Sequence, residues 1–144
     1  MEIIELTNHE KIIELVDKFG GEPLGLERVN KTWVALKNNE EVGISGFVKI
    51  NNDCWVLDPM AVKEEYRNNG IEEELINLVI NYARENKIKT LYNMTKYIKA
   101  HEKCGFEKIN ENELPENVRN LIVCFSCKKR NVDCFPQLMK LNLG

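Results

Sequence analysis

The segment from Val62 to Leu75 carries residues arranged in a way that suits anion binding. A polar connection, Lys63 to Asn69, leads from a predicted strand that ends at Val62 to a predicted helix that begins near Gly70. The N-terminus of a helix concentrates unpaired backbone N–H groups and a partial positive charge, and glycine lets a ligand approach the backbone closely. This connection is therefore predicted to hold a pyrophosphate with few side chains.

A βαβ crossover is expected to position this connection. Hydrophobic periodicity predicts a strand over Asp53 to Val62, an amphipathic helix over Gly70 to Asn86 and a strand over Ile88 to Asn93. Strands that are joined through a helix in this way pair in parallel.

The other predicted elements complete a mixed α/β (α+β) sheet that is flanked by helices. A short first strand precedes a helix that begins with Thr7 and Glu10 as a capping box. Short polar turns join three strands between residues 32 and 62 into an antiparallel meander. The remaining predicted elements are a helix over Thr95 to Cys104, a strand from Phe106 to Ile109 and a final strand over Leu121 to Phe125.

Length and composition exclude several classes of protein. The chain has 144 residues, which suits one domain, and its net charge of -3 does not favour a nucleic acid partner. No apolar run approaches the roughly 20 residues that span a bilayer, and no signal peptide begins the chain, so no membrane partner and a cytoplasmic location are expected. Five cysteines, an odd number, fit a reducing compartment.

Two short motifs resemble those of the GNAT N-acetyltransferase superfamily. The acyl-CoA motif of that family, with a loop that reads Q/R-x-x-G-x-G/A, is similar to Met60-Ala61-Val62 followed by Tyr66-Arg67-x-x-Gly70-Ile71 and Leu75-Ile76. The second motif, Y-E-K-x-G-F, is similar to the segment from His101 to Phe106. Two such motifs in the right order are far more specific than either alone.

The resemblance covers Ile3 to Phe125 and implies a GNAT-like sheet with acetyl-CoA as co-substrate. Acetyl-CoA would lie in a splay between two parallel strands, with backbone groups from Met60 to Val62, including Ala61, on the pantetheine arm. The residues implied at the pyrophosphate are Arg67, Asn68, Asn69, Gly70, Ile71 and Glu72.

Two side chains are candidates for the chemistry that the resemblance implies, in which a neutral amine attacks a thioester. Asp58 would act as general base, and the alternative is an Asp-Pro pair at a strand irregularity. His101 stands where the family often has a tyrosine that protonates the thiolate. Its alternative is a structural histidine that shares a helical face with Tyr97 and Cys104.

Glu72 departs from the motif, because the family has a residue with a very small side chain there. Glu72, Glu73 and Glu74 place three carboxylates in the first helical turn, where they would repel a pyrophosphate. The alternative is that Asn69 and Glu72 form a capping pair and the helix satisfies its own N-terminus.

The tail contains three cysteines, Cys124, Cys127 and Cys134, which are too few for a closed zinc site. No metal is expected, and unliganded thiols are the preferred interpretation. The expected organisation is a domain of residues 1–125 and a cysteine-containing tail of residues 126–144 that packs on it.

The leading functional hypothesis is an N-acetyltransferase that uses acetyl-CoA to modify a small-molecule amine or an amino acid. The alternative is an inactive or weakly active binding module with a self-capped phosphate loop. An exposed strand edge would be compatible with a homodimer.

Overall fold

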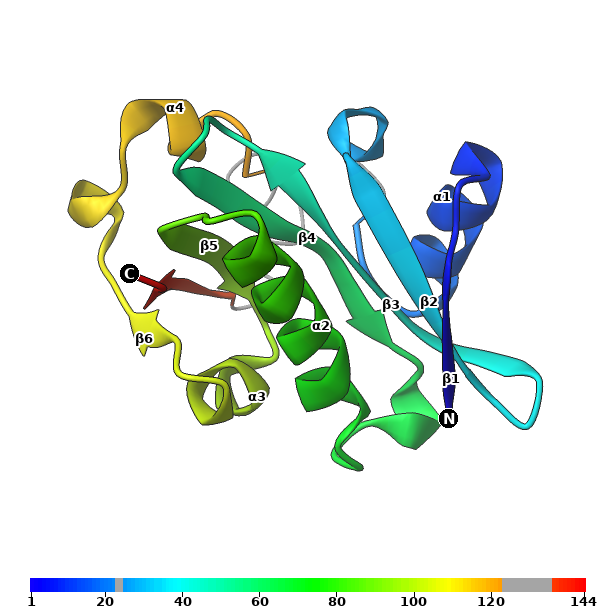
Figure 1. Cartoon of the computed structure of the whole chain (residues 1–144). Coiled ribbons are helices and arrows are strands. Elements are labelled where there is room, and N and C mark those ends of the chain that lie inside the picture. Colours follow the sequence, from blue (N-terminus) through cyan, green and yellow to red (C-terminus); the bar gives the residue numbers. More distant parts are fainter. Residues whose placement is uncertain (23–24, 123–135) are drawn as a thin grey trace.

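The structure of the protein is a computed structural model, and it describes residues 1–22, 25–122 and 136–144. Figure 1 shows a twisted central sheet with helix α2 lying across one face. The strands are β1 (Glu2–Glu5), β2 (Lys31–Lys37), β3 (Glu40–Lys49), β4 (Cys54–Val62), β5 (Thr90–Thr95), β6 (Glu107–Lys108) and β7 (Gln137–Asn142). The helices are α1 (His9–Lys18), α2 (Ile71–Glu85), α3 (Ile98–Lys103) and α4 (Glu116–Arg119), with short 3-10 turns η1 (Leu26–Arg28), η2 (Glu64–Tyr66) and η3 (Glu111–Glu113).

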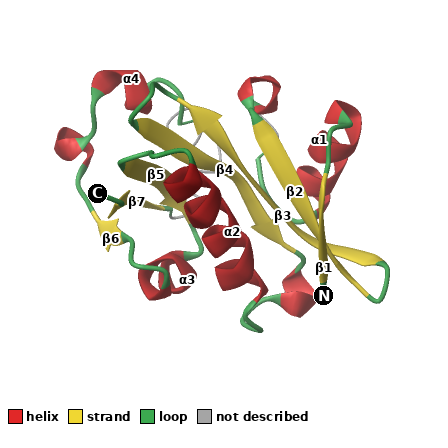
Figure 2. Cartoon of the chain, in the orientation of Figure 1, coloured by secondary structure: helices red, strands yellow, loops and turns green. Residues whose placement is uncertain are grey.

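The strands lie in the order β1-β2-β3-β4-β5-β7-β6. Strands β4 and β5 pair in parallel and the other neighbours pair antiparallel. The predicted mixed α/β fold, its meander and its βαβ crossover are therefore confirmed (Figure 2).

Alternation along the strands sends apolar side chains to two different layers. Trp55 and Leu57 of β4 pack in one cluster with α2 and α3, whereas Val56 between them packs in another cluster with Val118 of α4. A third cluster joins α1 to β2, β3 and β4. On the α2 side, the rings of Phe47 and Trp55 stack with centroids 3.8 Å apart. The sheet is thus covered on both faces, with α2 and α3 on one and α1 and α4 on the other.

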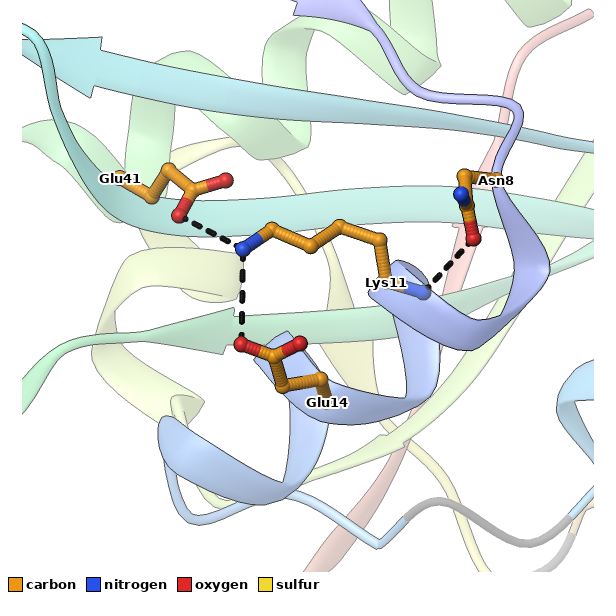
Figure 3. Close-up of polar contacts among 4 residues, drawn as sticks. All are labelled: Asn8, Lys11, Glu14 and Glu41. Carbon is orange, nitrogen blue, oxygen red and sulfur yellow. Dashed lines mark hydrogen bonds and ion pairs between the residues drawn. The ribbon is translucent and has the colours of Figure 1, made fainter.

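Helix α1 is capped by Asn8 and not by Thr7, so the predicted capping box is wrong. The Asn8 side chain accepts a hydrogen bond from the Lys11 backbone N–H at 3.1 Å (Figure 3). The Lys11 ammonium then contacts Glu14 at 3.4 Å and Glu41 of β3 at 3.2 Å. Asparagine is as good an N-cap as threonine, and the bridge to Glu41 ties the first turn of α1 to the sheet.

The predicted final strand is wrong where it can be compared, because Leu121 lies in a turn and Ile122 lies outside any strand. The rest of that segment falls outside the described residues. Strand β7, which sequence periodicity missed, lies between β5 and β6. Its neighbouring residues Leu138 and Met139 are both buried, in clusters on opposite faces, so the strand lacks the apolar-polar alternation that marks a half-exposed strand.

Two further expectations concern metals and membranes. No group of three or more His, Cys, Asp and Glu side chains among the described residues could hold a metal ion. The cysteines Cys124, Cys127 and Cys134 lie outside those residues. Within the part of the chain that the structure describes, no helix has the length and apolarity needed to cross a membrane.

Candidate functional site

The site is built on a separation between β4 and β5. Their parallel pairing covers Cys54–Val56 with Thr90–Tyr92 and stops there. Beyond that point β5 pairs only with β7, while β4 stays paired with β3 as far as Val62. The edge of β4 that faces away from β3 is therefore not covered by a strand from Leu57 to Val62, and its backbone groups must find other partners.

Two side chains of the protein itself bond to this edge. The Val62 N–H donates to the Tyr97 hydroxyl at 3.1 Å, and the Val62 carbonyl accepts from the Arg67 Nε at 2.9 Å. Arg67 also donates from Nη2 to the carbonyl of Phe19 at 2.9 Å, so its guanidinium is committed to two carbonyl groups. Burial raises the pKa of Tyr97 and keeps its hydroxyl protonated.

The connection after β4 forms a tight turn that ends in a left-handed glycine. Asn68 has φ +64° and Gly70 has φ +88°, and Gly70 is the N-cap of α2. A Cβ at Gly70 would meet no atom within 4 Å, so the space in front of the turn is open. Within the described residues, no hydrogen bond occupies the amides of Gly70 and Ile71. The turn therefore has the backbone features that the sequence predicted for an anion site.

Glu72 fills part of that site with a carboxylate. Only 4% of Glu72 is exposed, and its Oε2 accepts a hydrogen bond from the Asn68 N–H at 2.9 Å. The other oxygen, Oε1, is buried and has no hydrogen-bond partner. The helix does satisfy part of its own N-terminus, but through Asn68 and not through Asn69, whose side chain donates to the Arg67 carbonyl at 3.2 Å. The predicted Asn69–Glu72 capping pair is therefore wrong in its partner.

The remaining basic residue of the connection is also committed elsewhere. The Lys63 ammonium pairs with Glu40 of β3, and Glu65 lies 3.6 Å from it. Lys63 and Arg67, the two cations that the sequence offers to a phosphate, thus both serve internal partners.

The implied pantetheine residues point to different layers of the molecule. Met60 is half-buried and packs toward α2, and Ala61 is buried against the α1 cluster. The side chains of Met60 and Ala61 therefore pack into the protein, and Ala61 pairs with Ile44 of β3.

Asp58 lies where β4 and β5 separate. Its side chain is half-buried, and within the described residues it has no hydrogen bond or ion pair. Burial raises the pKa of Asp58 to about 7, and the positive charge of Arg28 opposes this rise. A carboxylate with such a pKa can take up and release a proton near neutral pH.

His101 lies away from any open surface and is fully buried. Its Nδ1 is 2.8 Å from the Tyr97 carbonyl and its Nε2 is 2.9 Å from the Asn93 amide nitrogen. Because a carbonyl only accepts, Nδ1 carries the proton and Nε2 accepts from Asn93. Burial lowers the pKa of His101 to about 4, so the ring is neutral. This geometry supports the structural alternative for His101.

Two residues of the site were not singled out for a functional role from the sequence. The sequence offers Tyr97 only as a neighbour of His101 on a helical face, and Arg28 lies within the predicted loop from Gly20 to Asn30, whose residue pattern indicates no function. No local pattern marks either residue, because Tyr97 contacts Val62 across 35 positions of sequence.

Comparisons with known proteins agree with this geometry. The sequence model of the Acetyltransferase (GNAT) family matches residues 5–106, and the chain belongs to that family. Comparison with curated proteins gives no match.

Several solved structures are similar to the whole chain. A GNAT-family acetyltransferase from Staphylococcus aureus is 25% identical, with a TM-score of 0.71 and 99% of each chain covered. A Mycobacterium tuberculosis protein in complex with CoA is 18% identical, with a TM-score of 0.73 and 100% of each chain covered. A GNAT acetyltransferase from Elizabethkingia anophelis with acetyl-CoA bound is 19% identical, with a TM-score of 0.64, covering 99% of this chain and 97% of that one.

Proposed function

We propose that the protein transfers an acetyl group from acetyl-CoA to the amine of a small molecule, such as an amino acid. The observation that carries the proposal is Asp58, a half-buried carboxylate that has no hydrogen bond or ion pair within the described residues and that stands where β4 and β5 separate. Family membership and the CoA-bound and acetyl-CoA-bound neighbours support the identity of the donor.

The backbone of the site fits such a donor, whereas three side chains do not. The uncovered edge of β4 and the open turn at Gly70 offer amides and carbonyls to a pantetheine arm and a diphosphate. Tyr97, Arg67 and Glu72 each bond to a backbone group that the donor would use. They must turn away before Val62 and Asn68 become available.

Asp58 would prepare the acceptor for reaction. Acetyl-CoA, when bound, would supply a thioester carbonyl that a neutral amine can attack. The carbon–sulfur bond then breaks, and CoA leaves as the thiol with the proton that the amine nitrogen loses. An amine in water is largely protonated, so a base must remove that proton first. With a pKa of about 7, Asp58 can accept it and release it to solvent near neutral pH.

Arg28 supports an acceptor that carries a carboxylate. It is half-buried at the end of η1, two residues before Asn30, whose N–H donates to the Phe47 carbonyl at 2.9 Å. Phe47 pairs with Leu57, the residue before Asp58. A cation and a carboxylate that lie near each other without forming an ion pair match the two charges of an amino acid.

A thiol-release assay tests the proposal. Acetyl-CoA would be offered with a panel of amino acids and with the matching amines that lack the carboxylate. We expect transfer to at least one amino acid and a rate at least tenfold lower for the Asp58→Asn variant. The control Asp53→Asn, at an exposed residue just before β4, should change the rate little. Absence of transfer to every acceptor would refute the proposal.

The alternative, a GNAT-fold module without catalysis, is favoured by one observation. The hydrogen bonds of Tyr97, Arg67 and Glu72 occupy the Val62 backbone groups and the Asn68 N–H with side chains of the protein itself. Calorimetric titration with acetyl-CoA separates the two functions, because a module of this kind would release no heat of binding at millimolar ligand. The cytoplasmic location and the homodimer expected from the sequence stay predictions.

A further inference from the structure

The turn at the start of α2 holds an anion that belongs to the chain. The Glu72 carboxylate contacts the Asn68 N–H at 2.9 Å, as a phosphate oxygen would in an anion-binding turn. Glu72 is 4% exposed and Asn68 is exposed, so the contact lies at the border between the core and the open turn. One amide of the turn is therefore occupied by an internal ligand.

The closed arrangement leaves several groups unsatisfied. Glu72 Oε1 is buried without a partner, and the amides of Gly70 and Ile71 have no acceptor within the described residues. A buried carboxylate oxygen without a donor is costly, whereas the amides at the exposed start of the helix are open to an incoming anion. A diphosphate brings more oxygens than one carboxylate and can reach the amides that Glu72 leaves free. A diphosphate that replaces the Glu72 carboxylate at the turn can therefore accept more hydrogen bonds from the backbone than the carboxylate does.

The β4 side of the same site is closed by a neighbouring side chain. Tyr97 accepts the Val62 N–H at 3.1 Å, and the Arg67 guanidinium lies 5.7 Å from the centre of the Tyr97 ring. Arg67 holds the Val62 carbonyl at 2.9 Å. Tyr97 and Arg67 thus occupy the strand edge at Val62, and Glu72 occupies one amide of the turn.

We infer that Glu72 is an internal competitor of the acyl donor, and that a diphosphate-bearing ligand binds only by displacing this carboxylate from Asn68. The inference rests on the proposed function, since it concerns the same site. Glu72 then lowers the affinity for the donor because it competes for the Asn68 N–H. This effect adds to the general repulsion between two negative charges.

Calorimetric titrations with CoA and with pantetheine, which lacks the diphosphate, test this role. The variants are Glu72→Ala, Glu72→Gln and the matched control Glu73→Ala. Glu73 lies in the same helical turn and also has a buried oxygen without a hydrogen bond, but it faces Lys103 at 3.5 Å and does not contact Asn68. Each alanine variant removes one negative charge. Only Glu72→Ala also removes the carboxylate that bonds to the Asn68 N–H.

The expected result is that Glu72→Ala binds CoA about tenfold more tightly than the unchanged protein, the factor that corresponds to one competing charge-assisted hydrogen bond. Glu73→Ala should gain much less, and the affinity for pantetheine should not change in either variant. Glu72→Gln, which keeps an oxygen near Asn68, should gain less than Glu72→Ala and serves as the readout if the alanine variant does not fold.

Three outcomes would overturn the inference. Equal CoA affinity in the unchanged protein and both Glu72 variants shows that the carboxylate does not compete. An equal gain in Glu73→Ala shows a general charge effect. Absence of CoA binding in every variant overturns both this inference and the proposed function. Binding by Glu72→Ala alone supports the inference while refuting acetyl transfer by the unchanged protein.

Discussion

Replacing Asp58 by asparagine should stabilise the protein at neutral and alkaline pH much more than in acid. Burial raises the pKa of this carboxyl from 3.8 to about 7. Between these values the native protein keeps the proton, whereas the unfolded chain releases it. The free energy of unfolding therefore falls as the pH rises through this interval, and asparagine, which does not titrate, removes the loss.

The size of the effect follows from the interval between the two pKa values. Each pKa unit corresponds to about 1.4 kcal/mol, so about three units give an upper limit of about 4 kcal/mol. Asp58 is partly exposed, and solvent screening lowers the expected difference to about 2 to 3 kcal/mol. That amount is a large part of the stability of a domain of this size.

Urea unfolding followed by tryptophan fluorescence measures this difference. Trp33 and Trp55 are 8% and 1% exposed, so both report loss of the core. The quantity to compare is the free energy of unfolding of Asp58→Asn minus that of the unchanged protein, at about pH 4.5 and about pH 8. The lowered pKa of His101 destabilises both proteins in acid by the same amount and cancels in the subtraction.

The control is Asp53→Asn, an exposed aspartate just before β4 whose carboxylate lies 3.9 Å from the Lys89 ammonium. The free energy of unfolding of Asp53→Asn should differ from that of the unchanged protein by no more than about 0.5 kcal/mol at both pH values. If the difference for Asp58→Asn also stays constant from acid to alkaline pH, Asp58 has an ordinary pKa and cannot act as a base of neutral pKa.

Three other predictions concern packing and protonation. Gly46→Ala should lower the free energy of unfolding by about 1 to 3 kcal/mol in the same urea assay, because the added Cβ would collide with the backbone carbonyl of Lys31. An unchanged midpoint would contradict this. Trp55→Ala should cost about 3 to 5 kcal/mol through loss of the stack on Phe47, and a loss below about 1 kcal/mol would show that the core repacks. In an NMR titration the His101 ring should stay neutral down to about pH 5, and a midpoint near pH 6.5 would contradict its burial.

Elements with a regular apolar period were predictable from the sequence. Helix α2 was predicted over Gly70 to Asn86 and extends over Ile71–Glu85, because its buried residues repeat along one face. Helix α3 was predicted to begin at Thr95, but Thr95 ends β5 and its hydroxyl accepts the Tyr97 N–H at 2.9 Å. A turn held by one side chain leaves no periodic signal, so the helix start was misplaced.

The location of the candidate site was predictable from the sequence. The side chains of the protein that bond to its backbone groups were not. A strand, a polar connection and Gly70 predict an anion-binding turn from local sequence alone. The contacts that close this turn depend on chain segments that only the fold brings together, since Arg67 reaches Phe19 across 48 positions of sequence. Residue type alone shows that Glu72 is unsuitable for a diphosphate, but not that its carboxylate already contacts Asn68.

The position of β7 has a consequence for how the protein is made. Strand β5 is synthesised more than forty residues before β7, yet β7 lies beside it in the sheet and pairs with it from Thr90 to Thr95. While the chain is still growing on the ribosome, one edge of β5 therefore has no strand partner. We expect a chain that stops before Gln137 to expose this edge and to be recognised by chaperones or to aggregate.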